Sequence, residues 1–484
     1  MSFRKDLLSG SFWNILASFS GKFLAFFTSI IILKIFTVSE VGIFDYGFTL
    51  ITTLIPLLSL NFGALTMYYL PKLKDAEKHA FTIIISSLGF IVLASILTFL
   101  LKNTILGYLG KDNISTYYNV ILVTGILFTE YGISILVFQT LKKFSTAFIC
   151  SVGQSVLLFA LIALEVFLKV HGLIYYYRVT GLFVYYIISY LPFVAYTLFK
   201  VIKESPKFRI KSFKHFFNST VKYYPIFIVI WASTFIVRSL IFKDSSETLG
   251  ALRLLESYYI IPGTIIGSIS LALIPLIQSA RKNSQKSYEK LQKLMSIINL
   301  VLFILFIFSF NFFSNLIFGT KYAFVGSYYP MFIIGFCIYT FISNFSSFIM
   351  SFKDAFWKTN IAAGVGQIAF VIASIILPKT LVGYSTALLI NGIVLMITFA
   401  LIVKRIRNFV KRQWIFVLTS LALFLGSGFI LTLQISALLQ LIIGIVATGV
   451  IIIVLITSKN LDYEMIKETI NFIKEKLMSK KIIN

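Results

Sequence analysis

The chain has 484 residues, of which 58% are hydrophobic and only 13% are charged, and its mean hydropathy is +0.93. A soluble domain carries about 25% charged residues, so this composition excludes a soluble protein and predicts one embedded in a membrane. We interpret the net charge of +25 as basic loops that face anionic lipid, and not as a surface that binds nucleic acid.

Fourteen apolar segments follow one another along the chain, and each is long enough to cross a membrane as a helix. Such a helix needs about 20 apolar residues. The division of the last apolar stretch into two spans rests on the polar residues Gln434 and Ser436. The predicted spans are residues 11–37, 42–70, 80–101, 115–140, 144–169, 172–199, 221–242, 248–279, 294–318, 324–352, 355–378, 381–403, 413–435 and 437–457.

The basic residues between these spans predict the orientation of the chain. Cytoplasmic segments of membrane proteins are rich in Lys and Arg. Most of the 43 basic residues lie on the side of the amino terminus, whereas the opposite loops hold only Lys102, Lys111, Lys169, Lys243, Lys321 and Lys379. We therefore expect both termini in the cytoplasm of a bacterium, with the chain in its plasma (inner) membrane and the first span retained.

An internal repeat relates the first six spans to the next six. Its matches are Gly42 with Gly250, Asn103–Gly107 with Asn315–Gly319, Val152–Gln154 with Val365–Gln367, Gly172 with Gly383 and Gly181 with Gly392. Because each unit has an even number of spans, both enter the membrane in the same direction, which predicts a pseudo-twofold axis along the membrane normal. The fold class is therefore all-α and polytopic, with two six-helix lobes and two further helices.

The repeat divides the chain into five parts. We expect the carboxyl-terminal tail to lie along the inner interface or to form a short solvated helix, because apolar residues recur in it at helical spacing. Since one chain supplies both lobes, we expect a monomer. The parts are an N-lobe of residues 1–199, a cytoplasmic linker of 200–220, a C-lobe of 221–406, an appendage of 407–457 and an amphipathic tail of 458–484.

No pattern in the sequence indicates an enzyme. The longest outer loop, near residues 102–115, is too short for an external catalytic domain, and there is no Walker sequence, nucleophile elbow or zinc-type histidine pair. Cys150 and Cys337 lie inside apolar segments and are read as packing residues. We expect no catalytic residue, metal site or cofactor, and we expect a substrate site between the two lobes.

Charged side chains inside the spans are the candidate functional residues, because each is costly in hydrocarbon. Lys22 and Glu130 lie near the middle of their spans, and one interpretation is that they form a structural pair. The others lie nearer the outer side. The arginines there either line a central cavity or pair with the carboxylates, and Arg is suited to a pyrophosphate because its planar fork makes two hydrogen bonds. The candidate substrate-binding residues are Lys22, Arg178, Arg238 and Arg253, and those for ion coupling or charge pairing are Asp45, Glu130, Glu165 and Glu256.

Several segments of residues 10–405 resemble one known family. Thr37–Gly42, with Leu60–Ala64 at the end of the next span, resembles the opening of the polysaccharide transport family, and Leu316–Tyr322 resembles its signature after span 9. The order of Pro225, Arg238, Gly250, Pro275 and Gly383 also fits. The chain thus resembles the Wzx-type flippases of the multidrug/oligosaccharidyl-lipid/polysaccharide (MOP) exporter superfamily.

The resemblance implies a V-shaped pair of lobes around a central cavity that opens alternately to each side. It implies a substrate, a polyprenyl-pyrophosphate-linked oligosaccharide, that moves to the outer leaflet for assembly of O-antigen (lipopolysaccharide), capsule or exopolysaccharide. Membrane lipid and a glycan polymerase of the same pathway are the implied partners, and a H⁺ or Na⁺ gradient or the membrane potential is the implied driving force.

The balance of charges inside the spans departs from a purely cationic cavity and keeps two other interpretations open. Four basic residues face four acidic ones. A cation-coupled exporter of small molecules or drugs from the same superfamily would use Asp45 or Glu130 as its accessible carboxylate. A passive lipid scramblase or assembly scaffold is the third interpretation.

Overall fold

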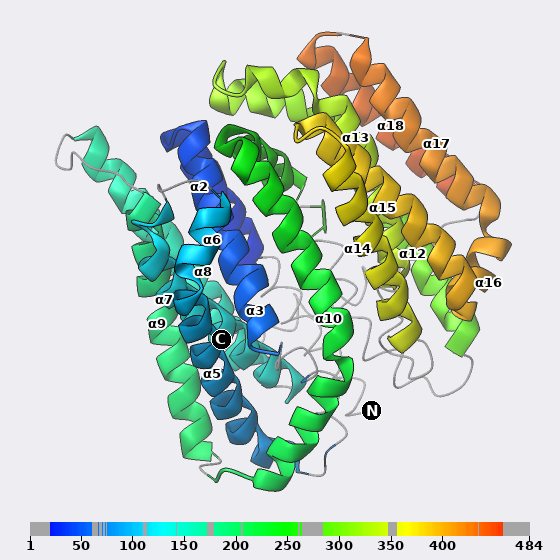
Figure 1. The fold of residues 1–484 in the computed structure, drawn as a ribbon. Coiled ribbons are helices and arrows are strands. Elements are labelled where there is room, and N and C mark those ends of the chain that lie inside the picture. The colour runs from blue at the N-terminus through cyan, green and yellow to red at the C-terminus, as the bar shows by residue number, and fades with distance from the viewer. Residues whose placement is uncertain are drawn as a thin grey trace, which may run out of the picture.

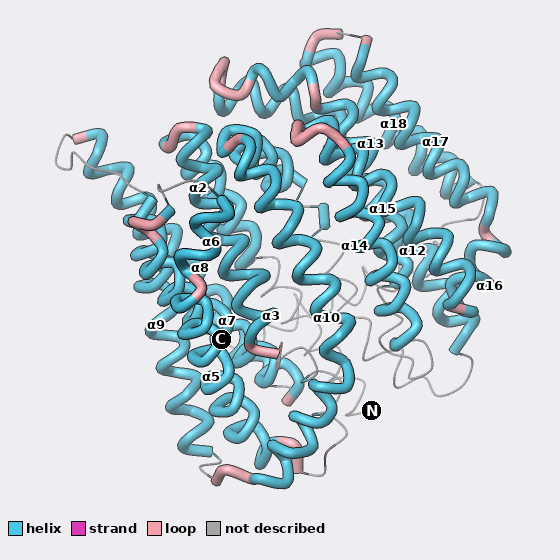
Figure 2. The backbone as a smooth tube through the Cα atoms, viewed as in Figure 1, coloured by secondary structure: helices cyan, strands magenta, loops and turns pink. Residues whose placement is uncertain are grey.

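The computed structural model of the chain describes most of its length, and every element in the described part is helical (Figures 1 and 2). The described residues are 20–60, 66, 70, 73, 75–109, 114–141, 143–171, 179–204, 207–259, 262–263, 284–346, 356–433 and 435–457.

The first bundle, blue to teal in Figure 1, contains the elements that precede α10. It begins with a helix over residues 20–35. The elements that follow are α2 (Val38–Thr49), the π-helix η1 (Leu50–Leu54), α3 (Ile55–Leu58), α5 (Glu77–Leu100), α6 (Lys102–Leu109), α7 (Tyr118–Thr140), α8 (Phe144–Val170) and α9 (Val179–Glu204).

The second bundle, yellow-green to orange in Figure 1, stands beside the first, and α10 runs between them. A helix over residues 246–259 follows α10 (Ile210–Asp244). The remaining elements are α12 (Ser284–Phe318), the 3-10 helix η4 (Ala323–Ser327), α13 (Tyr329–Ser343), the 3-10 helix η5 (Asn344–Ser346), α14 (Phe356–Ile376), α15 (Leu381–Ile402), α16 (Lys404–Arg412), α17 (Trp414–Thr432) and α18 (Ala437–Thr457).

The prediction of an all-α polytopic membrane protein is confirmed. The described residues contain 12 helices that are long and apolar enough to cross a membrane, and each corresponds to one predicted span. The other two predicted spans, 11–37 and 248–279, extend beyond the described residues, and their described parts are helical. Gln434 lies outside the described residues, but α17 ends and α18 begins on either side of it, as the sequence predicted.

Helices occupy most of the predicted cytoplasmic linker of residues 200–220. Helix α9 continues to Glu204 and α10 begins at Ile210. The start of α10 is held against α5, where the ring of Phe213 stacks near Phe90 and the hydroxyl of Ser212 lies 2.6 Å from Nδ1 of His79. The predicted tail of residues 458–484 lies outside the described residues.

Helix α2 has a regular start and an irregular continuation. Its first turn is a capping box in which Thr37 and Glu40 bond to each other's backbone N–H. The π-helical turn η1 follows, just before Pro56. Proline lacks the N–H that would bond to the carbonyl four residues earlier, so the regular helical pattern is interrupted here. In the same segment the hydroxyls of Thr52 and Thr53 donate to backbone carbonyls of the preceding turn.

The same tyrosine contact occurs in both bundles. In the first, the hydroxyl of Tyr118 at the start of α7 donates to the carbonyl of Thr98 on α5 at 2.9 Å. In the second, Tyr329 at the start of α13 donates to the carbonyl of Ile307 on α12. Both tyrosines are fully buried, so the internal repeat extends to hydrogen bonds that the sequence comparison did not find.

The last two long helices pack against the second bundle. Gly444 brings α18 onto α12, since a Cβ atom there would lie 2.5 Å from the Cβ atom of Phe308. The side-chain amide of Asn311 also donates to Gln440 at 2.9 Å. Gly428 similarly brings α17 against Ile334 of α13. Helix α18 therefore packs mainly on α12, and α17 packs mainly on α13.

Candidate functional site

The two bundles meet where α2 crosses the helix of residues 246–259. A Cβ atom at Gly42 would lie 1.8 Å from the carbonyl oxygen of Ser246, and one at Gly250 would lie 2.0 Å from the carbonyl oxygen of Val38. Only glycine permits such a close backbone approach. Beside this crossing the hydroxyls of Ser39 and Ser246 are 2.7 Å apart. Because Gly42 and Gly250 are matching positions of the repeat, their contact places the crossing on the pseudo-twofold axis.

A network of four charged side chains lies about one helical turn beyond the glycines. Arg238 of α10 donates through Nη1 to Asp45 and through Nη2 to Glu256. Arg253 donates through Nη1 to the other oxygen of Asp45, at 3.2 Å. Two positive and two negative groups therefore neutralise one another across the junction of the bundles.

Burial makes this network energetically important. Only 1% of the Asp45 side chain and 14% of the Arg238 side chain are exposed. Removing one partner of a buried ion pair leaves the other charge uncompensated and costs about 3–5 kcal/mol. Tyr384 of α15 extends the network, because its hydroxyl donates to Glu256 at 3.4 Å. The network therefore joins α2 of the first bundle to three helices of the second half of the chain.

Further contacts close the same end of the molecule. The hydroxyls of Tyr46 on α2 and Ser239 on α10 are 2.9 Å apart, and the Tyr46 ring stacks on Phe242 with centroids 4.4 Å apart. Lys321, after α12, donates through Nζ to the carbonyls of Leu33, Lys34 and Phe36. A lysine of the second half thus caps the carboxyl-terminal end of the helix over residues 20–35. This end carries the loops that we predict to lie outside the cell.

The deep charges, Lys22 and Glu130, do not form an ion pair with each other in the described part of the chain. The Lys22 side chain is exposed on the helix of residues 20–35. Glu130 is fully buried and its Oε2 atom lies 3.0 Å from the hydroxyl of Ser87. Glu165 is also buried, on α8, and Arg178 lies outside the described residues.

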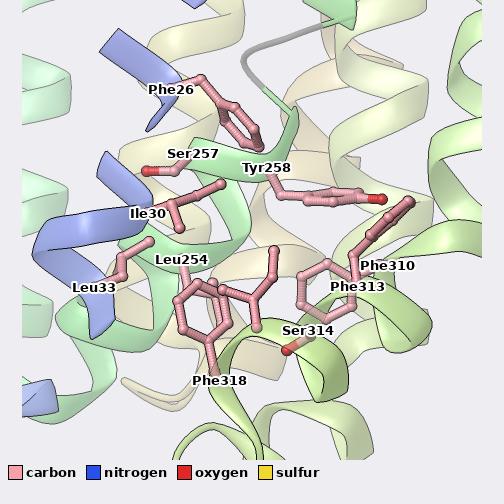
Figure 3. A pocket seen from close by; sticks show the side chains of 11 residues that line it. Phe26, Ile30, Leu33, Leu254, Ser257, Tyr258, Phe310, Phe313, Ser314 and Phe318 are labelled. Atoms are coloured by element: carbon pink, nitrogen blue, oxygen red, sulfur yellow. The ribbon is translucent and has the colours of Figure 1, made fainter. Parts of the chain in front are cut away.

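A small apolar pocket lies where the helices of residues 20–35 and 246–259 meet α12 (Figure 3). The pocket is shallow and partly open to the surroundings. Helix 20–35, helix 246–259 and α12 form its walls with Phe26, Ile30, Leu33, Leu254, Ser257, Tyr258, Phe310, Phe313, Ser314, Ile317 and Phe318. Its aliphatic and aromatic lining suits a hydrocarbon chain.

The opposite end of the first bundle is held by Lys143, between α7 and α8. Its Nζ atom lies 2.7 Å from Glu204 and 3.2 Å from Glu77. Burial alone would lower the pKa of this ammonium group, but the two carboxylates hold its pKa above the ordinary value. Lys143 is therefore a cation that joins the ends of α5 and α9.

The structure adds residues that the sequence did not single out. Tyr384, Tyr46 and Lys321 are common residue types whose partners come from distant helices. One signal was available for Ser39 and Ser246, because each lies a few residues before one of the matching glycines. The sequence named Asp45, Arg238, Arg253 and Glu256 separately, and the structure brings these four together.

Comparison with sequence families gives one extensive match. A sequence profile of the polysaccharide biosynthesis protein family matches residues 7–281, more than half of the chain. No curated protein sequence matches the chain.

Solved structures with the same fold are membrane transporters. A lipid II flippase, MurJ, in an inward closed conformation aligns over 92% of this chain and 98% of its own, with a TM-score of 0.68 and 17% identity. An inward-facing multidrug resistance transporter of the MATE family aligns over 83% of this chain and 99% of its own, with a TM-score of 0.60 and 13% identity. A MOP superfamily transporter from Pyrococcus furiosus aligns over 83% and 96%, with a TM-score of 0.56 and 13% identity. The chain therefore has the fold of these membrane transporters.

Proposed function

The chain belongs to the polysaccharide biosynthesis protein family, and from that premise we propose that it is a flippase for lipid-linked oligosaccharide. Its substrate is an oligosaccharide repeat unit linked through pyrophosphate to a polyprenyl lipid. It moves the unit from the cytoplasmic to the outer leaflet of a bacterial plasma (inner) membrane, where surface polysaccharide such as O-antigen, capsule or exopolysaccharide is assembled. Both termini lie in the cytoplasm, and the protein acts as a monomer.

The single observation that carries this proposal is the polar junction on the pseudo-twofold axis. Asp45 and Arg253, at matching positions of the repeat, pair with each other, and Asp45 also pairs with Arg238 across the junction. Polar contacts of this kind can be replaced by contacts with water or with an anionic ligand, whereas an apolar core can separate only at high cost. The junction is therefore suited to opening and closing in each transport cycle, which is what alternating access requires.

The same arginines support a pyrophosphate as part of the substrate. A guanidinium group stays charged when it is desolvated and makes two parallel hydrogen bonds with phosphate oxygens. In the closed junction Asp45 and Glu256 take that place on Arg238. When the lobes separate, Arg238 and Arg253 become available to the pyrophosphate, together with Lys22 and Arg178. Asp45, Glu130, Glu165 and Glu256 serve charge pairing or ion coupling.

The lipid part of the substrate needs an apolar path beside the polar cavity. The pocket of Figure 3 and Arg253 share one helix, in which the lining residue Leu254 directly follows Arg253. A prenyl chain in this region would remain in contact with hydrocarbon while the head group is held by charge. A glycan polymerase of the same pathway receives the translocated unit.

The alternative function, export of cationic small molecules, is less well supported by the charges. A cationic drug needs an accessible carboxylate, and the Asp45 side chain is buried and engaged by two arginines. Glu130 is also fully buried. Neither of the two carboxylates considered for that function is open in this conformation.

Deletion and complementation test the proposed function in the source bacterium. A deletion strain without a second flippase should lose its surface polysaccharide and accumulate the lipid-linked unit on the cytoplasmic side of the membrane. Wild-type protein should restore both, and Lys22→Ala should restore neither although it reaches the membrane at normal abundance. Lys22→Arg should restore part of the activity, because the charge matters most at this depth.

The structural role of Lys22 predicts a different pattern. If Lys22 only neutralises Glu130 in another conformation, Lys22→Ala should lower abundance, and Lys22→Ala/Glu130→Ala should restore abundance and transport. Normal surface polysaccharide in the deletion strain would contradict the proposed function itself.

A further inference from the structure

Glu130 is a buried carboxyl group for which the proposed function leaves open whether it pairs with a charge or couples an ion. It lies on α7 against Ser87 of α5, inside the first bundle, and both residues are fully buried. Its Oε1 atom has no hydrogen-bond partner. Its Oε2 atom has one polar contact, with the Ser87 hydroxyl at 3.0 Å.

Counting the hydrogens at Ser87 shows which protonation state of Glu130 fits. The Ser87 oxygen lies 2.8 Å from the carbonyl oxygen of Ile84 and 3.0 Å from Glu130 Oε2. A hydroxyl has one hydrogen to donate and two lone pairs that accept. Ser87 has two acceptors for that hydrogen, the Ile84 carbonyl of the preceding turn and Glu130 Oε2. When the hydrogen goes to Ile84, the second contact is a hydrogen bond only if the Glu130 carboxyl carries a proton and donates it to the serine oxygen.

The surroundings of Glu130 also favour the neutral form. Helices α5, α8, α9 and α2 pack against α7, as do η1 and α3, and α10 packs against α5. Residues 50–58 of η1 and α3 have no ionisable side chain. Other titratable groups on these helices include Asp45, Tyr131, Glu165, Tyr186, Tyr190 and His215, and none of them contacts Glu130 among the described residues.

The charged groups at the ends of α5 and α9 are engaged with one another. Glu77 and Glu204 pair with Lys143, and His79 contacts Ser212. Thus no cation of the described residues reaches Glu130, and an ionised carboxylate buried without a partner is strongly unfavourable. The charge distribution therefore favours a proton on this group, and the hydrogen-bond geometry accommodates one.

A packed segment connects Glu130 with the charge network. Helix α7 packs on η1, which follows Asp45 by one turn. A Cβ atom at Gly125, less than two turns before Glu130, would lie 2.1 Å from Cδ1 of Ile55. Any movement of α2, η1 and α3 that opens the junction must therefore shift the packing of α7 near Glu130. A π-helical turn is a usual place for such local adjustment.

We propose that Glu130 is the proton-binding site of the transport cycle, an inference that rests on the proposed function for its role in transport. With the junction closed, the proton lies on Glu130 Oε2 and is donated to Ser87. When α2, η1 and α3 move, water enters between α5 and α7, the O–H bond of the carboxyl group breaks, and the proton passes to water. The carboxylate left behind is stable only while hydrated, so reprotonation accompanies closure of the junction.

Infrared difference spectroscopy tests the protonation without any transport. The full-length protein, in phosphatidylethanolamine/phosphatidylglycerol vesicles at neutral pH, should show a C=O band of a protonated carboxyl group that Glu130→Gln removes. Ser87→Ala should shift this band to higher frequency, because the carboxyl loses its acceptor. The matched control is Ser134→Ala, one turn along α7 and equally buried, which should leave the band unchanged. Identical spectra for wild type and Glu130→Gln would overturn the proposal.

Disulfide formation across the junction tests the coupling. In the variant Ser39→Cys/Ser246→Cys, with Cys150 and Cys337 replaced by Ala, the yield of oxidised protein should fall as the pH is raised. Adding Glu130→Gln, which keeps the side chain neutral, should remove that dependence. A pH dependence that stays the same after Glu130→Gln is added would refute the coupling. A third outcome is a disulfide yield that changes with the Na⁺ concentration at constant pH and no longer does so after Glu130→Gln is added. It would show that Glu130 binds Na⁺, and would overturn the proposal that it binds a proton.

These two measurements separate this inference from the proposed function. Both follow the protein alone and need no substrate. They can succeed even if the substrate is not a lipid-linked oligosaccharide, and they can fail even if it is.

Discussion

The two bundles share a framework but differ in the chemistry buried inside them. Tyr118 and Tyr329 make the same hydrogen bond in each bundle. Ser87 of α5 and Asn299 of α12 are separated by the same interval as the matching Asn103 and Asn315. In the first bundle Ser87 contacts a carboxyl group, whereas Asn299 is fully buried with neither side-chain atom hydrogen bonded. An amide cannot titrate, so this position of the second bundle offers no counterpart to the carboxyl group that Ser87 contacts.

The two halves differ in the same way at the pseudo-twofold axis, where their backbones match and their side chains do not. The glycines at the crossing match in both halves, but the charged residues three positions later have opposite signs, Asp45 and Arg253. Two identical charges would repel each other on the axis. Because their charges are opposite, the two matching positions form an ion pair, and Arg238 and Glu256 extend it into a neutral network.

The largest effect is expected from a substitution that breaks the charge network at Arg238. Arg238→Ala leaves both Asp45 and Glu256 without their contacts to this residue, and we expect a loss of about 3–5 kcal/mol of stability. Arg253→Ala should cost less, because that side chain makes one contact with Asp45 and is 25% exposed. Membrane abundance and the apparent melting temperature of the purified protein measure the difference.

A compensating variant shows whether charge is the cause. Arg238→Ala/Asp45→Asn should recover part of the lost stability, because it removes a buried charge that has lost a partner. An equal loss for Arg238→Ala and Arg253→Ala, with no recovery in the double variant, would mean that the side-chain volumes matter and the charges do not.

The glycine crossing gives a smaller and symmetric prediction. Gly42→Ala and Gly250→Ala should prevent closure of the junction to the same extent, because each adds a Cβ atom within about 2 Å of a carbonyl oxygen of the other bundle. Disulfide formation between Ser39→Cys and Ser246→Cys should fall in both variants. Gly426→Ala is the matched control, since a Cβ atom there would meet nothing within 4 Å. Unchanged disulfide formation in either glycine variant would show that the bundles do not close at this crossing.

The smallest effect on stability is expected when the hydroxyl of Tyr118 or Tyr329 is removed, and it compares the two bundles directly. Tyr118→Phe removes one hydrogen bond and should lower stability by about 1 kcal/mol. Tyr329→Phe should cost more, because the Tyr329 hydroxyl also lies 2.6 Å from that of Tyr259, which the variant leaves without this partner. Thermal unfolding of both variants beside Tyr328→Phe, an exposed control, measures this. A larger loss for Tyr118→Phe would contradict the proposed relation of the two bundles.

The sequence predicted the helices and the repeat because both depend on local patterns. Hydrophobic length defines a span, and a repeat is visible wherever glycine is required, as at Gly42 and Gly250. The charges of the junction were also found, since any charge in a span is unusual. Their pairing was left open, because a sequence does not show which helices lie side by side.

Three features of the site depend on tertiary structure alone. Lys321 was predicted only as a lysine of an outer loop, but the carbonyls that it caps belong to the other bundle. Tyr384 has no signal of its own beyond the adjacent Gly383. The suggested pair of Lys22 and Glu130 assumed that equal depth means contact, whereas the structure directs Glu130 to Ser87. The sequence gives the depth of a residue along its span, but the residues that it contacts depend on how the helices pack.

Translocation by the purified protein tests the central claim most directly. The Ser39→Cys/Ser246→Cys variant, with Cys150 and Cys337 replaced by Ala, is reconstituted in vesicles that contain a fluorescent lipid-linked oligosaccharide. The account predicts that reduced protein moves the head group across the bilayer, where it becomes protected from a glycosidase added outside, and that oxidised protein does not. Equal protection with reduced and oxidised protein, or no translocation by the reduced form and by wild type, would contradict the claim that the two lobes move a lipid-linked oligosaccharide by opening and closing this junction.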